Sequence, residues 1–312
     1  MEENHFPQME QKSEEKPETE PNQMNEVQQV QSYIQNSEKT KLVELICKKS
    51  NEARQKLKGE YLSNYGTELT KELDSVLSGN VKDLISGLMK TPIEFDADKI
   101  YYAIKGIGTD EDVLSEVIAT RPSRHLSKIK EKYPELYNKT LEEDIKGDTS
   151  GYYQNLLIAL VQGGRSDNPY PNSQKMKDLV DKLKDDDENL KENLLSYLVN
   201  CSYGEICTIC CEYEKTYGKS ILETIKKIFE RDECDCFYML LNYISNPGKF
   251  FAEKIHGFKE KDLIRIIVSR NEENMDEIRD AYKELYGNEL VDDIKKNTSG
   301  DFQLGLTILA EK

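Results

Sequence analysis

Apolar residues recur along this chain at spacings of three and four, the period of an α-helix that buries one face. Apolar runs of this kind lie at 84–88, 113–118, 156–161, 238–244, 263–267 and 304–309. Runs that alternate between apolar and polar residues are scarce, and so are the glycine-rich turns of β-hairpins. The pattern therefore predicts an all-α fold.

One spacing occurs four times: two tyrosines four residues apart, which places both rings on the same face of a helix. A glycine or asparagine follows the second tyrosine each time, and these residue types tolerate the left-handed backbone that ends many helices. The four sets are Tyr61, Tyr65 and Gly66; Tyr133, Tyr137 and Asn138; Tyr213, Tyr217 and Gly218; and Tyr282, Tyr286 and Gly287. Successive sets are about 70 residues apart, which indicates four copies of one helical unit.

Each copy is expected to hold about five helices, because polar or glycine-rich breaks divide it into that number of apolar segments. Prolines at 92, 171 and 247 lie in the joints between copies, where a helix cannot continue. We expect an N-terminal tail at 1–26 and repeats at 27–92, 93–168, 169–246 and 247–312. Packing between such short helices should supply most of their stability.

The formal net charge of −16 limits the classes of partner. Nucleic-acid binding depends on Lys and Arg at phosphates, so nucleic acid is not expected. Direct electrostatic attachment to acidic lipids is disfavoured for the same reason. A divalent cation that bridges the protein and an anionic membrane removes this objection.

The composition of the chain indicates the nature of its N-terminal segment and the cellular compartment of the protein. Residues 1–24 are rich in Glu, Gln and Pro and contain no apolar signal core, so we expect a disordered acidic tail. The sequence has no apolar stretch of about 18 residues that would span a membrane. We expect a cytoplasmic protein whose seven cysteines are reduced thiols.

The second copy contains two glycines at alternate positions, Gly106 and Gly108, and Asp148 lies about 40 residues further on. Alternate glycines allow positive φ angles, which can direct successive carbonyl oxygens at one point. Calcium takes about six to eight oxygen ligands and accepts carbonyls beside carboxylates. The carbonyls of Ile104, Gly106 and Gly108 with the Asp148 carboxylate would fill part of this shell. One charged ligand implies weak affinity, on the order of 10⁻⁴ M, unless a lipid phosphate completes the coordination.

The same residues have a purely structural interpretation. Thr109 could cap a helix with Asp112 three residues on, and the two glycines could form a tight turn between helices. Asp148 could cap the helix that follows it. The glycines do not form a dinucleotide-binding motif, since the third glycine is absent and no strand precedes them.

The segments 103–111 and 142–154, with Arg121 between them, closely resemble a repeat of the annexin family. The fourth copy is similar at 268–270 and 290–309, and the resemblance extends from about Val27 to the C-terminus. It implies four five-helix repeats in a slightly curved disk. The convex face of this disk would bind calcium (Ca²⁺) and anionic phospholipid such as phosphatidylserine. The N-terminal tail would lie on the opposite side and modulate protein partners.

The resemblance also assigns residues. Those that match the family's main calcium site are Ile104, Gly106, Gly108 and Asp148, and those that match its accessory position are Thr109 and Glu111. The charged residues that match the family's central axis are Asp96, Glu116, Arg121 and Arg270. Because buried charges need partners, we expect these four to form ion pairs between domains.

The other copies depart from the calcium motif. Copy one has Ile34 and Asn36 at the two glycine positions and Val76 at the position of the acidic ligand. Copy three has Asp186 and Glu188 at the glycine positions and Ile228 at the position of the acidic ligand. An apolar side chain cannot ligate a hard cation, so these two copies lack the standard site. Copy four has Ile255 at the first glycine position.

Copy four keeps Gly257 and has Asn297 at the acid position, whose neutral oxygen would leave a weakened site. The acidic run Asp185–Glu188 in copy three has two interpretations: a solvated loop, which charge runs usually form, or a calcium site built from side chains.

Five cysteines form a second candidate cluster: Cys207, Cys210, Cys211, Cys234 and Cys236. Thiolates at these spacings can bind zinc. The positions i, i+3 and i+4 of the first three also suit the buried face of a helix, where cysteine acts as a small apolar residue. We favour core packing.

The sequence is consistent with two functions for this protein. The first is calcium-dependent binding to anionic phospholipid on the cytosolic face of membranes. The second is a calcium-independent scaffold that binds cytoskeletal or other protein partners through the degenerate repeats and the acidic tail. No enzyme is expected, because none of the three histidines, His5, His125 and His256, belongs to a recognisable nucleophile and base arrangement.

Overall fold

The computed structural model describes residues 25–106, 108–166, 171–184 and 189–312. Throughout these ranges the regular elements are α-helices, which confirms the predicted all-α class. None of the described helices is both long enough and apolar enough to cross a bilayer. Residues 1–24 of the predicted tail and the acidic run Asp185–Glu188 lie outside the described residues.

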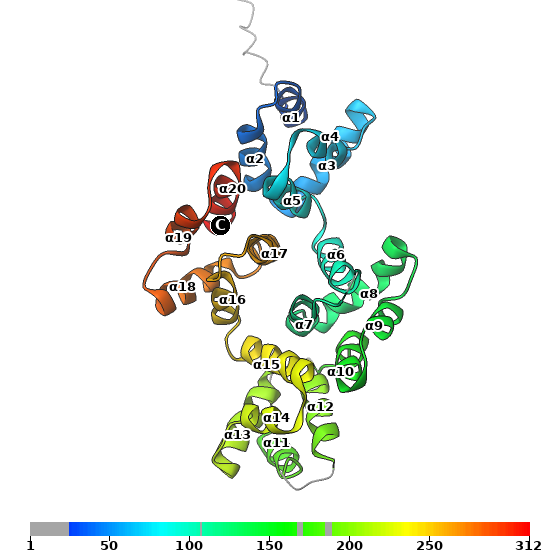
Figure 1. The fold of residues 1–312 in the computed structure, drawn as a ribbon, viewed down its shortest axis with the longest axis vertical. Helices are drawn as coiled ribbons and strands as arrows, with labels where there is room; N and C mark the ends of the chain where they lie inside the picture. The colour runs from blue at the N-terminus through cyan, green and yellow to red at the C-terminus, as the bar shows by residue number, and fades with distance from the viewer. Residues whose placement is uncertain (1–24, 107, 167–170, 185–188) are drawn as a thin grey trace, which may run out of the picture.

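The described helices form four bundles around a common centre (Figure 1). The first bundle contains α1 (Glu26–Gln35), α2 (Lys39–Lys48), α3 (Asn51–Tyr65), α4 (Leu69–Val76) and α5 (Gly79–Leu88). The second contains α6 (Pro92–Ile104), α7 (Glu111–Thr120), α8 (Ser123–Tyr137), α9 (Leu141–Asp148) and α10 (Gly151–Gln162). The third contains α11 (Ser173–Val180), α12 (Leu190–Asn200), α13 (Tyr203–Tyr217), α14 (Ile221–Ile228) and α15 (Arg231–Ser245). The fourth contains α16 (Pro247–Ile255), α17 (Glu260–Arg270), α18 (Met275–Tyr286), α19 (Leu290–Asn297) and α20 (Gly300–Ala310).

The tyrosine pairs occupy equivalent places in the four bundles, as the spacing predicts. The two ring centroids of each pair lie 4.8, 4.7, 4.7 and 4.9 Å apart in chain order. The residue after each pair is left-handed, at Gly66, Asn138, Gly218 and Gly287. These residues end the third helix of each bundle.

The first tyrosine of each pair is buried and keeps a hydrogen-bond partner for its hydroxyl group, as a buried hydroxyl requires. Tyr133 donates to Asp144 and Tyr282 donates to Asp293, both at 3.0 Å. In the third bundle Tyr213 and Thr224 are 2.7 Å apart. These contacts fix the fourth helix against the third in bundles two, three and four.

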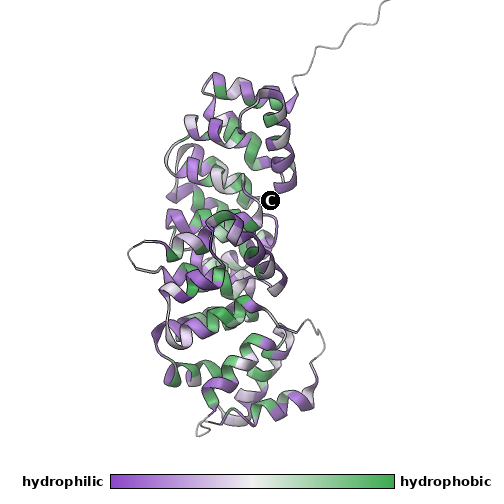
Figure 2. Cartoon of the chain, turned by 90° about the vertical axis from the view of Figure 1, so that its right-hand side faces the viewer, coloured by the Kyte–Doolittle hydropathy of each residue, from purple (hydrophilic) through white to green (hydrophobic). Residues whose placement is uncertain are grey.

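The apolar core is divided into two clusters rather than four. One cluster joins the first and fourth bundles, where α2 packs against α20, and the other joins the second and third, where α7 packs against α15. Figure 2 shows the body from the side, with hydrophobic residues turned into the bundles and hydrophilic ones outward. The repeat pattern of the sequence does not reveal this pairing.

Buried charges connect the two clusters. Glu116 of α7 accepts two hydrogen bonds from Arg265 of α17, at 2.9 and 2.8 Å, and the two residues are only 1% and 3% exposed. Lys254 of α16 lies 3.3 Å from the same carboxylate and 3.0 Å from Asp112. The expected inter-domain ion pairing is thus confirmed for Glu116, although its partners Arg265 and Lys254 were not predicted.

The expectation is wrong for the other three axis residues. No carboxylate among the residues that the structure describes lies within ion-pair distance of Arg270. Asp96 and Arg121 both belong to the second bundle and bind each other, at 2.6 and 2.8 Å, so the expectation of inter-domain pairing is wrong for them. Burial alone would raise the pKa of Asp96. The charge of Arg121 and the hydrogen bonds from Arg121 and His125 outweigh burial and lower that pKa to about 2.

We expect Gly248→Ala in α16 to lower the free energy of unfolding by about 2 kcal/mol. A Cβ at Gly248 would lie 2.6 Å from the carbonyl oxygen of Glu277, a backbone atom of α18 that cannot move independently. Gly59→Ala is the matched control, because a Cβ there meets nothing within 4 Å and alanine favours the helix by about 1 kcal/mol. Urea unfolding of both variants measures the effects; equal stabilities would contradict the close approach of α16 and α18.

We expect Asp96→Asn to lower the free energy of unfolding at neutral pH by about 3 kcal/mol, because Arg121 stays buried without its counter-charge. The pKa of Asp96 is lowered in the folded state, so its contribution is complete above the ordinary value of 3.8 and is lost as the pH falls through about 2. The difference in the free energy of unfolding between parent and variant should therefore shrink as the pH falls from 3.8 to about 2. Urea unfolding at several pH values measures this difference, with Asp276→Asn, at an exposed aspartate, as control. A difference in the free energy of unfolding that does not depend on pH would refute the lowered pKa of Asp96.

Candidate calcium site

The loop between α6 and α7 has a backbone that requires glycine. Gly106 has φ of 137° and Gly108 has φ of 86°, values that residues with a Cβ rarely adopt. The N–H of Asp110 donates to the carbonyl of Ala103 at 2.7 Å and closes the loop. Both glycines are exposed, so the loop projects backbone atoms toward solvent. Ile107 between them lies outside the described residues.

The loop lies beside the end of α9, where Asp148 is found. The hydroxyl of Thr109 donates to the carbonyl oxygen of Asp148 at 3.4 Å. Asp148 is the last residue of α9 and is exposed. Beyond it, the N–H of Thr149 closes the helix on Ile145 at 3.0 Å, and the Gln154 amide donates to the carbonyl of Lys146 at 3.2 Å. The structure thus brings together two segments about 40 residues apart in the sequence.

The structural interpretation of these residues is correct for the turn and wrong for the caps. Gly106 and Gly108 do form a tight turn between α6 and α7, as predicted. Asp110, not Thr109, caps α7, because its side chain accepts from the N–H of Val113 at 3.1 Å. Asp112 pairs instead with Lys254. Ser150, not Asp148, stands at the N-cap of α10. Neither predicted cap is therefore present, and the exposed carboxylate of Asp148 stays available beside the loop.

The accessory residue Glu111 begins α7, and its carbonyl accepts from the hydroxyl of Tyr153 at 3.3 Å. An open groove runs from the loop to the start of α15, which contributes Asp232 and Asp235. These two acids come from the third bundle, and no spacing in the sequence associates them with the loop.

The fourth bundle has a different loop. Gly257 does not adopt positive φ, and Phe258 does so instead, with φ of 46°. The Asn297 side chain donates its amide to the carbonyl of Asp293 at 2.8 Å, so it bonds back to its own helix. This geometry lacks the glycine conformation seen in the second bundle.

The first and third bundles carry apolar side chains at the key positions, as the sequence shows. Ile34 is buried at the end of α1, and Val76 and Ile228 pack against the core clusters. Asp186 and Glu188 lie outside the described residues.

The expected core packing is wrong for two of the three α13 cysteines, Cys207 and Cys211, but Cys210 does pack against the core cluster. Cys207 and Cys211 are exposed and Cys210 is half-buried, because Ile206, Ile209 and Tyr213 form the buried face of α13. Of the other two, Cys236 is buried and Cys234 is half-buried. Among the described residues, no three His, Cys, Asp or Glu side chains form a group that could hold a metal ion. A site at Gly106, Gly108 and Asp148 would depend mainly on backbone oxygens.

Comparison with known proteins identifies the fold. The sequence model described as annexin matches residues 26–88, 95–160 and 251–309. Annexin A11 of Oryctolagus cuniculus is 36% identical over 272 residues, which cover 84% of this chain and 54% of that protein. Annexin A1 of Sus scrofa is 32% identical over 281 residues, which cover 86% of this chain and 80% of that protein. The chain spans about half the length of the annexin A11 relatives that it matches.

Solved structures agree with this result. The structure titled annexin III has a TM-score of 0.88 at 28% identity, covering 94% of this chain and 96% of that one. Chicken annexin V in complex with Zn²⁺ has a TM-score of 0.83 at 26% identity, covering 94% and 97%. Annexins generally are non-enzymatic, cytosolic proteins that associate peripherally with membranes and bind anionic phospholipid with calcium. By its sequence matches and its fold of repeated helical bundles, this chain belongs to the annexin family.

Proposed function

We propose that this chain binds anionic phospholipid membranes in a calcium-dependent manner through the loop of its second repeat. The observation that supports the proposal is the left-handed backbone at Gly106 and Gly108 beside the exposed Asp148. The carbonyls of Ile104, Gly106 and Gly108 and the Asp148 carboxylate would hold the ion, with Thr109 and Glu111 at an accessory position. These are hard oxygen donors of the kind that Ca²⁺ prefers.

The charges explain why the lipid and the ion would bind together. One carboxylate neutralises only half of the charge of Ca²⁺, so the bound ion keeps positive charge that a lipid phosphate can satisfy. The protein carries a net charge of −16 and would otherwise be repelled by an anionic surface. Calcium would act as the bridge, and membrane attachment would be peripheral, on the cytosolic face.

The number of sites sets the strength of attachment. Each loop that engages the membrane multiplies the affinity of the others, so a protein with one intact loop should bind weakly. Gly257 and Asn297 of the fourth repeat would add at most a weak site, since Gly257 lacks positive φ and Asn297 bonds to its own helix. The scaffold function, with protein partners for the tail and the degenerate repeats, is the contrasting outcome of the experiment below.

We expect Asp148→Asn to reduce calcium-dependent sedimentation with phosphatidylserine vesicles by about tenfold in affinity, because the only charged ligand is replaced by a neutral one of the same shape. Asp276→Asn is the matched control: it removes the same charge from an exposed aspartate of α18 and should sediment like the parent. Sedimentation is measured over a calcium titration and again in excess chelator.

Three results would contradict the proposal. Equal sedimentation of the parent and Asp148→Asn would exclude the second-repeat site. Vesicle binding that persists in chelator, or that is absent at every calcium concentration, would favour the scaffold.

A further inference from the structure

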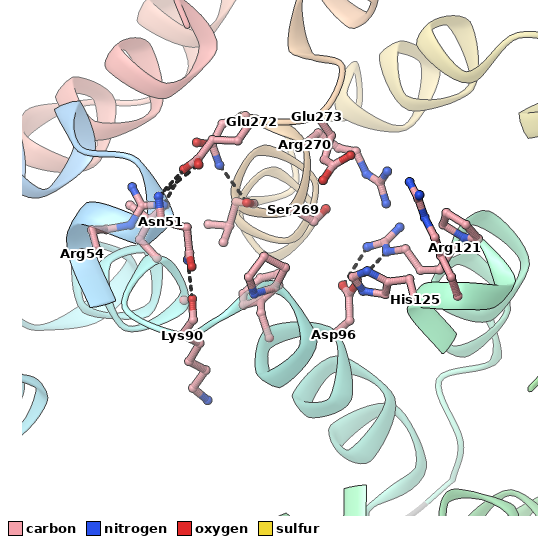
Figure 3. A pocket seen from close by; sticks show the side chains of 18 residues that line it. Asn51, Arg54, Lys90, Asp96, Arg121, His125, Ser269, Arg270, Glu272 and Glu273 are labelled. Atoms are coloured by element: carbon pink, nitrogen blue, oxygen red, sulfur yellow. Dashed lines mark hydrogen bonds and ion pairs between the residues drawn. The ribbon is translucent and has the colours of Figure 1, made fainter. Parts of the chain in front are cut away.

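A cavity of about 260 Å³ lies at the opposite ends of α6 and α7 from the calcium loop. It is formed where the first, second and fourth bundles meet (Figure 3). Its wall includes the starts of α3 and α8 and the turn after α17. The volume is close to the lower limit for small-molecule sites, about 300 Å³.

Most charges in this cavity already have partners. Arg54 binds Glu272 at 2.8 Å, and Glu272 also accepts from the N–H of Asn51. Arg121 binds Asp96 at two points. The charges of these groups are paired and leave little net charge to attract a ligand, although the Nε of Arg54 also lacks a hydrogen-bond partner.

Arg270 is the exception. It is 6% exposed, and its Nε has no hydrogen-bond partner. Its guanidinium lies 4.6 Å from the centre of the Phe251 ring, and no carboxylate in the described part of the chain comes within ion-pair distance. Figure 3 shows its side chain directed into the cavity on the side of Arg121. A buried guanidinium without a counter-charge is costly, and an anion in the cavity would supply that charge.

Two neighbouring features also favour an anion. Arg124 lies on the rim of the cavity, is exposed, and comes from the first turn of α8. The N-cap of α8 is Pro122, which provides no side-chain acceptor. Its carbonyl accepts from the N–H of His125 at 2.8 Å, which leaves the N–H groups of Ser123 and Arg124 for a ligand at the positive end of the helix. Glu273 is an exposed carboxylate on the same rim, and its negative charge would repel an anion.

We infer that this cavity binds a phosphate group, either as free phosphate or as the phosphomonoester of a small molecule. Arg270 would bind it in the interior, since a guanidinium fork matches phosphate oxygens. Arg124 and the start of α8 would bind it from the rim. Glu273 would oppose it. The inference is independent of the calcium loop, which lies at the other end of α7.

The test is isothermal titration with inorganic phosphate, and separately with glycerol 3-phosphate, in chelator and without vesicles. The parent should show saturable binding of at least one probe, and tighter binding of glycerol 3-phosphate would identify the phosphomonoester as the ligand. Arg270→Gln should weaken binding about tenfold and Arg124→Gln about threefold. Glu273→Gln should strengthen binding, a gain that misfolding cannot produce. Arg231→Gln, an exposed arginine at the start of α15, is the matched control and should bind like the parent.

Thermal unfolding of each variant checks that it is folded. The inference is overturned if the parent shows no saturable binding of either probe, or if Arg270→Gln and Arg231→Gln bind equally well. Unchanged affinity in both Arg124→Gln and Glu273→Gln would place the anion elsewhere and overturn it as well.

Discussion

The ion pair of Glu116 and Arg265 determines how the two halves of this protein meet. Each half has its own apolar cluster. The halves meet through aromatic contacts of Tyr243 in α15 with Phe250 and Phe251 in α16, and through charged groups of α7, α16 and α17. A buried pair of this kind adds little net stability, because desolvation offsets most of the attraction. It does disfavour other arrangements, since any sliding of α7 along α17 leaves a charge buried without its partner. We therefore regard the pair as an orienting contact that sets the direction of α7, and with it the position of the glycine loop that precedes α7.

The four repeats share a framework while their loops differ, and the two depend on different physics. The framework relies on local contacts that each repeat can form alone: a tyrosine pair, a left-handed helix end, and a hydroxyl bonded to a nearby side chain. The loop relies on backbone angles that only glycine adopts easily, at Gly106 and Gly108. The other three bundles lack this pair of glycines and keep the framework, so a repeat can keep its fold and lose the backbone geometry of this loop.

The sequence predicted what is local and missed what is distant. Tyrosine spacing and helix ends were predictable because residues four apart share a helix face. The partner of Glu116 was not, because Arg265 lies 149 residues away and no pattern links the two positions. Two cysteines of α13, Cys207 and Cys211, were misplaced because several registers of that helix present an apolar face. Packing selects the register that buries Ile206, Ile209 and Tyr213. The cap of α7 was off by one residue, since Thr109 and Asp110 are both good caps and the loop geometry decides between them.

Helix α7 connects the two candidate ligand sites. Its first turn follows the glycine loop, Glu116 lies at its middle, and Arg121 at its end lines the cavity with Arg270. A helix of this length is about 15 Å long, so the two sites are too far apart for direct electrostatic contact in salt solution. Any effect of one ligand on the other would have to move α7 against α17. The buried Glu116 and Arg265 pair opposes that motion, because it would separate two charges with no water to replace the lost contact. The same contact that orients the glycine loop would therefore favour independent binding at the two candidate sites.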